Sequence, residues 1–191
     1  IGGALVGMAV VLALYPDAAR TADDAVVTGI GVVAPTGIGL TAHWQAVLRA
    51  KSGIGRISRF DPSSYPVQLA GQVPGFVARD HVPGRLLPQM DLWTHMSLAA
   101  AEAALADAGV DPSTMDEYAM GVVTAGSSGG TDFGQREMVR LYQNGPSWVG
   151  AYQSIAWFYA ATTGQLSIRH GMRGPSGVIC TEQAGGLDSL G

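Results

Sequence analysis

The residues best placed to do chemistry lie near the end of this sequence, where an apolar run meets a pair of glycines. The run 177–181 (GVICT) is typical of a buried strand, and Gly185 and Gly186 open a helix-like stretch shortly afterwards. A strand that turns sharply into a helix exposes the residue at the turn, and the helix N-terminus favours developing negative charge. This geometry suits a nucleophile. Cys180 lies inside the apolar run, so we expect it to be a small buried hydrophobe and a poor nucleophile.

Ser128 is a second candidate nucleophile, because the run 126–130 (GSSGG) fits the pattern G-x-S-x-G. The pattern lies between a strand-like and a helix-like segment, as the nucleophile elbow of a hydrolase must. A catalytic triad also needs an acid and a histidine later in the chain, and only His170 follows. A serine hydrolase acting through Ser128 is therefore a minor alternative that needs partners from outside this sequence.

Two further patterns point to no ligand. The run 29–34 (GIGVVA) matches a dinucleotide-binding fingerprint, but Pro35 follows directly and no acidic residue lies about 20 positions later. We interpret its glycines as residues that allow close backbone packing. The histidines have no metal-ligand spacing, so we expect no metal site; they are His43, His81, His95 and His170.

Composition and charge exclude several classes of protein. Of the 191 residues, 47% are hydrophobic and 14% are charged, which argues against an intrinsically disordered chain. The net charge is −4, and the 11 basic residues are scattered, so a nucleic acid partner is not expected. A single cysteine cannot form a disulfide within the chain, and we expect an intracellular, cytoplasmic protein.

The elements that must position these residues alternate between strands and helices, which indicates an α/β fold. The helix over 91–108 is predicted most strongly, because it is rich in Ala and Leu and is followed by Gly109 at the position of a C-cap. The Pro-rich stretch 51–88 predicts loops and short edge strands. The other predicted helices are 42–50, with Thr41 as N-cap, 131–142 and 154–161, and the strands are 25–28, 118–124 and 177–181.

The first 24 residues stand apart from this pattern. Residues 1–15 carry no charge, but they are fewer than the roughly 20 that a membrane-spanning helix needs. We expect a hydrophobic strand or helix, or an artefact of the assigned start, and no membrane anchor. Residues 25–191 form the second unit, and the sequence begins with Ile1, so we expect a fragment of a longer protein.

Taken together, the motifs resemble the chain length factors, the ketosynthase β subunits of bacterial aromatic type II polyketide synthases. The catalytic ketosynthases of this thiolase-fold family carry an acyl-accepting cysteine in a run similar to 181–188 (TEQAGGLD), and the equivalent position here is Gln183. The resemblance covers roughly residues 25–191. Its other segments are 26–35 (VVTGIGVVAP), 59–61 (RFD), 65–66 (YP), 85–89 (RLLPQ), 121–125 (GVVTA), 157–160 (WFYA) and 168–175 (IRHGMRGP).

This resemblance implies a thiolase-like, five-layered α/β/α/β/α fold built from two similar halves, of which this chain is mainly the N-terminal half. It also implies a heterodimer with a catalytic ketosynthase α subunit that supplies the cysteine and histidines. Acyl groups would arrive on the phosphopantetheinyl arm of an acyl carrier protein, with no cofactor bound by this chain. The growing poly-β-keto chain would extend through a tunnel at the subunit interface.

Gln183 decides what this chain can do alone. A carboxamide has no ionisable nucleophile and forms no thioester, so we expect no condensation by this chain by itself. The amide still has a hydrogen-bond donor and an acceptor. A side chain that fills a vestigial pocket is the favoured interpretation, and a malonyl-carrier-protein decarboxylase that uses Gln183 to hold the thioester carbonyl is the alternative.

The resemblance also places the residues that set tunnel length. By alignment of the glycines at 129 and 130, the gating positions are Thr131, Gly134 and Met138, and their spacing puts all three on one helical face. Subunits that make octaketides tend to have Phe at the first and last of these positions. Thr and Met, with Gly between them, therefore predict a roomier tunnel and a decaketide or longer product.

Overall fold

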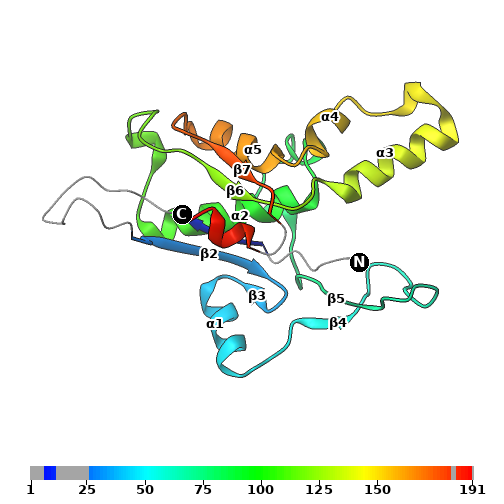
Figure 1. The fold of residues 1–191 in the computed structure, drawn as a ribbon, viewed down its shortest axis with the longest axis horizontal. Helices are drawn as coiled ribbons and strands as arrows, with labels where there is room; N and C mark the ends of the chain where they lie inside the picture. The colour runs from blue at the N-terminus through cyan, green and yellow to red at the C-terminus, as the bar shows by residue number, and fades with distance from the viewer. Residues whose placement is uncertain (1–6, 12–25, 182–183, 191) are drawn as a thin grey trace, which may run out of the picture.

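The computed structural model describes residues 7–11, 26–181 and 184–190. Its longest element is helix α2 (Leu92–Ala108), which lies between two layers of structure (Figure 1). One layer is the antiparallel sheet β1 (Gly7–Val11), β2 (Gly29–Ala34) and β3 (Gly37–Ile38), with α1 (Leu40–Leu48) beside it. The other layer holds the parallel pair β6 (Val123–Ala125) and β7 (Gly177–Ile179) together with α5 (Ala161–His170). The expected α/β architecture is confirmed.

The remaining elements lie at the edges of these layers. Helix α3 (Thr131–Asn144) projects away from the body, and α4 (Gln153–Ala156) returns the chain toward α5 (Figure 1). The short antiparallel pair of β4 (Ile54–Arg56) and β5 (Leu69–Gly71) confirms the prediction of short strands within 51–88. Short 3-10 turns and the last helix complete the described chain: η1 (Ala78–Asp80), η2 (Leu87–Gln89), η3 (Pro112–Thr114), η4 (Pro146–Trp148) and α6 (Gly185–Asp188).

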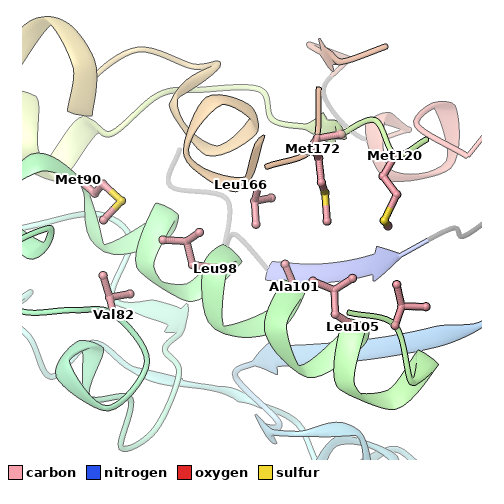
Figure 2. Packing of buried hydrophobic residues seen from close by; sticks show 10 residues of the cluster. Val82, Met90, Leu98, Ala101, Leu105, Met120, Leu166 and Met172 are labelled. Carbon is pink, nitrogen blue, oxygen red and sulfur yellow. The ribbon is translucent and has the colours of Figure 1, made fainter. Parts of the chain in front are cut away.

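The main core lies between α2 and α5. Leu98, Ala101 and Leu105 point from α2 toward Leu166 and Met172, and all five are buried (Figure 2). Two pairs of threonines extend these contacts: Thr94 of α2 with Thr162 of α5 at 3.3 Å, and Thr163 of α5 with Thr124 of β6 at 2.7 Å, between hydroxyl oxygens. Full burial of a Leu side chain stabilises a fold by about 1.5–3 kcal/mol, so this cluster holds α5 and the β6–β7 pair on α2.

The glycines of the apparent dinucleotide fingerprint hold α2 against β2. A Cβ at Gly31 would lie 1.8 Å from the carbonyl oxygen of Ala100, and one at Gly29 would lie 2.3 Å from that of Ala104. Only a residue without a side chain allows this approach. The interpretation of these glycines as packing residues is confirmed.

Several predicted boundaries were wrong. The strand expected at 25–28 lies at Gly29–Ala34, and α1 starts after Gly39, whose φ is 89°, so Thr41 is inside the helix and is not its N-cap. The strand predicted over 118–124 reduces to Val123–Ala125, and Val123 is half exposed. The helix predicted over 154–161 is interrupted at 157–160, between α4 and α5. By contrast, α2 with Gly109 as its C-cap, and α3, confirm the predictions, although Asp91 is the N-cap of α2 and not its first residue.

Within the apolar start of the sequence, residues 7–11 form a strand antiparallel to β2. Over these five residues this agrees with the expectation of a hydrophobic strand or helix within residues 1–15. Among the described residues, none of the helices has the length and hydropathy to cross a membrane.

Candidate functional site

The parallel strands β6 and β7 are each followed by a helix, and the chain leaves both strands at the same edge of the sheet. Strand β6 leads through 126–130 into α3, and β7 leads through 180–184 into α6. The amide of Gly126 donates to the carbonyl of Ile179 at 3.0 Å, which joins the two turns at their start. The carboxyl ends of parallel strands are the usual place for ligand sites in α/β proteins.

Gln183 itself lies outside the described residues, but the residues around it show how its turn is built. The hydroxyl of Thr181 donates to the carboxylate of Asp188, the last residue of α6, at 2.6 Å. Gly185 is buried there, and a Cβ on it would lie 3.2 Å from the Cβ of Ala125 in β6. The predicted strand and helix on either side of Gln183 are therefore present, with the helix packed on the neighbouring strand.

Cys180 is exposed, which corrects the expectation of a buried hydrophobe. The reason is that β7 ends at Ile179, so Cys180 already belongs to the turn. An apolar run in the sequence indicates burial, but it does not show at which residue the chain leaves the sheet.

Ser128 has the predicted place between β6 and α3 and is partly buried, but His170 lies far from it. Thr163 near the start of α5 contacts Thr124 of β6, whereas His170 is the last residue of that ten-residue helix. His170 is seven residues further along α5 than Thr163, about 10 Å along the helix, and so lies at the end of α5 away from this contact. Among the residues that the structure describes, Ser128 has no triad partner in reach of a hydrogen bond.

The contacts and burial of the four histidines indicate structural roles. His43 shares a hydrogen bond of 2.7 Å with the hydroxyl of Thr36, and the ring of His81 stacks on Phe76. Burial lowers the pKa of His95 and of His170 below the ordinary value of 6.5. Within the described part of the chain, no three His, Cys, Asp or Glu side chains are grouped to hold a metal ion.

Helix α3 carries the three predicted gating positions, and they differ in surroundings. Thr131 and Met138 are exposed, Met138 by 45%, whereas Gly134 is buried. What covers Gly134 is the indole of Trp157, from the segment between α4 and α5. The three positions share a side of the helix, at the border between its buried and its open face.

Two buried carboxylates that the sequence analysis missed hold α3 in place. Asp91 accepts hydrogen bonds from the amide of Trp93 at 3.1 Å and from the amide of Phe133 at 2.7 Å, so it caps both α2 and α3. Glu137, only 3% exposed, pairs with Arg140 at 2.6 Å and accepts from the amide of Gly150. Asp91 precedes a predicted helix and could have been found as an N-cap, but no sequence signal marks Glu137.

Compared with models of protein families, the sequence matches the N-terminal domain of β-ketoacyl synthases over residues 22–190. The chain belongs to the β-ketoacyl synthase family. The thiolase-like α/β fold class expected for it is confirmed by this match and by the solved structures below.

Curated relatives of this β-ketoacyl synthase chain include polyketide proteins of Streptomyces. The tetracenomycin polyketide synthase ketoacyl synthase beta subunit of Streptomyces glaucescens is 60% identical over 164 residues, which cover 86% of this chain and 40% of the relative. An actinorhodin polyketide protein of Streptomyces coelicolor, named as a β-ketoacyl synthase 2, is 57% identical over 165 residues, with the same coverage. The predicted resemblance to ketosynthase β subunits is confirmed, and the chain spans about two fifths of the length of these relatives.

Solved structures show the same fold. A type II polyketide synthase acyl-carrier protein in complex with its ketosynthase bound to the hexaketide matches with a TM-score of 0.74 and 26% identity, over 87% of this chain and 44% of that one. The ishigamide ketosynthase/chain length factor matches with a TM-score of 0.68 and 23% identity, over 85% and 43%.

Proposed function

We propose that this chain is part of the non-nucleophilic subunit of a heterodimeric type II polyketide ketosynthase, and that it helps to form the polyketide tunnel and sets poly-β-keto chain length. The observation that carries the proposal is the 60% identity to a ketoacyl synthase beta subunit of a polyketide synthase. The position of Gln183 in the sequence, between β7 and α6, supports it. The resemblance puts an acyl-accepting cysteine at this position in the catalytic ketosynthases, and a carboxamide is no nucleophile.

The catalytic partner supplies what Gln183 cannot. A thiolate attacks the thioester carbonyl and takes the acyl group from the departing carrier thiol, whereas a neutral carboxamide offers no such electron pair. The partner's cysteine therefore holds the growing chain. The acyl carrier protein brings the extender units to that cysteine, and this chain contributes the wall along which the product extends, in the cytoplasm.

We place the partner against α5 and the free edge of β7. Within the described residues β7 pairs with β6 alone, and an unpaired strand edge is a template for pairing with another chain. Beside it lies a mainly apolar hollow of about 490 Å³. Its rim carries exposed apolar side chains, among them Ile155, Phe158 and Ile168.

The gating positions Thr131, Gly134 and Met138 belong to the same proposal. Thr131 and Met138 are exposed on α3 and are free to meet a product chain. Neither carries a large aromatic ring, so we propose a decaketide or longer product.

The experiment uses the full-length subunit, co-expressed with its cysteine-bearing partner and incubated with malonyl-carrier protein. Intact-mass spectrometry then shows which subunit gains acyl mass. The proposal predicts acylation of the partner alone and polyketide only when both subunits are present. Acyl mass on this chain would contradict it. A Gln183→Ala variant that stops priming while condensation of a supplied starter continues would favour the decarboxylase instead.

A further inference from the structure

Of the three gating positions, Gly134 is buried, and the side chain of another residue, Trp157, covers it. A Cβ at position 134 would lie 2.7 Å from Cδ1 and 3.0 Å from Nε1 of Trp157, closer than real Cβ contacts allow. The missing side chain is therefore what lets the indole lie on the helix. At this position the helix presents the indole of Trp157 where a side chain of its own would otherwise be.

The backbone of Trp157 is fixed to the start of the same helix. Its carbonyl accepts a hydrogen bond from the amide of Gly130 at 3.2 Å, and a Cβ at Gly129 would lie only 1.8 Å from that carbonyl oxygen. The neighbouring segment is tied down further along α3, where Gly150 donates to the buried carboxylate of Glu137. The indole thus has a fixed attachment and cannot be moved aside with its loop at low cost.

One side of the indole remains open. Trp157 is 56% exposed although its ring contacts Gly134, and Thr131 and Met138 lie one turn before and one turn after that contact. The indole is larger and more rigid than the side chains of the two exposed gating residues, so it exposes more apolar surface to a product chain than either of them.

We infer that Trp157 is a specificity-determining residue of the tunnel, and that its indole limits chain length at the position where α3 has a glycine. The inference rests on the proposed function. It replaces the expectation that Gly134 simply widens the tunnel, because the space that the glycine leaves is taken by the ring.

The test compares product length by mass spectrometry for the full-length subunit assembled with its ketosynthase partner. Trp157→Ala removes the ring, and we expect the main product to grow by one or more two-carbon units. Trp157→Phe keeps most of the bulk and should leave the length nearly unchanged. The matched control is Trp148→Ala, since Trp148 is similarly exposed at 61% and lies in η4, while the atoms nearest to a Cβ at position 134 all belong to Trp157.

A second pair of variants tests the contact itself. Gly134→Thr should push the indole outward and shorten the product, whereas the same change together with Trp157→Ala should lose most of this shortening. If Trp157→Ala prevents assembly of the complex, Trp157→Leu keeps an apolar contact and decides the question by the same readout.

The outcomes separate the inference from the proposed function. An unchanged product from Trp157→Ala or Trp157→Leu, while Phe at position 131 or 138 shortens the product, overturns the role of Trp157 alone. An unchanged product from all of these variants overturns the length-setting function.

Discussion

At the scale of single residues, the packing of the helices depends on glycines, which have no side chain. Gly29 and Gly31 let α2 approach β2, and Gly134 lets Trp157 lie on α3. The sequence shows these glycines plainly, and it was possible to predict that 29 and 31 allow close packing. It was not possible to predict the neighbour of Gly134, because Trp157 comes from a segment 23 positions later whose path depends on the tertiary fold.

Gly31→Ala tests this packing. Its methyl group would overlap the carbonyl oxygen of Ala100, so helix and strand must separate, and we expect the free energy of unfolding to fall by about 1–3 kcal/mol. Gly84→Ala is the control, because nothing lies within 4 Å of a Cβ there. Urea unfolding of the two variants checks this, and equal midpoints would show that α2 and β2 do not pack as described.

A second residue-scale prediction concerns pH. Burial is the main cause of the lowered pKa of His95, although the backbone of Leu87 and the charge of Asp91 oppose it. The unfolded chain therefore binds a proton at His95 more readily than the folded chain, so stability should fall as the pH decreases below 6.5. In His95→Gln this fall should be smaller. Urea midpoints measured above and below pH 6.5 check it, and parallel pH profiles would contradict the assignment.

At the scale of elements, the sequence predicted the long helices α2 and α3 well, but it did not predict the break at 157–160 or the bounds of the short strands. Helix α2 was predicted within one residue because its composition and Gly109 agree, whereas β6 has only three residues and depends on its pairing with β7. A strand this short has little pattern of its own. The same limit explains Cys180, whose exposure is set by the last pairing of β7 at Ile179.

Asp91 gives the element-scale prediction. One carboxylate caps α2 and also accepts from the amide of Phe133 in the first turn of α3, where Gly130 has no side chain to serve as cap. Asp91→Ala should remove both contacts and lower the free energy of unfolding by about 2 kcal/mol. Asp111→Ala, which removes the cap of η3 alone, is the control and should cost less. Equal losses in thermal unfolding would contradict the double role.

At the scale of the whole molecule, two of the three sheets in the described residues lie on either side of α2, and many apolar side chains are exposed. Trp157, Phe158 and Ile168 are each at least half exposed, and Leu187 in α6 is 76% exposed. Exposed apolar surface of this extent marks an interaction face. It agrees with a chain that spans about two fifths of its relatives and that we propose to work inside a heterodimer.

The measurement that tests the central claim most directly is the product length made by the full-length subunit with Thr131→Phe or Met138→Phe, assembled with its ketosynthase partner. Both side chains are exposed on α3, so an aromatic ring there should narrow the tunnel without disturbing the core. The account predicts a shorter main product from each variant, with the partner still acylated at a normal rate. A product of unchanged length from both variants, in complexes that assemble normally, would contradict it.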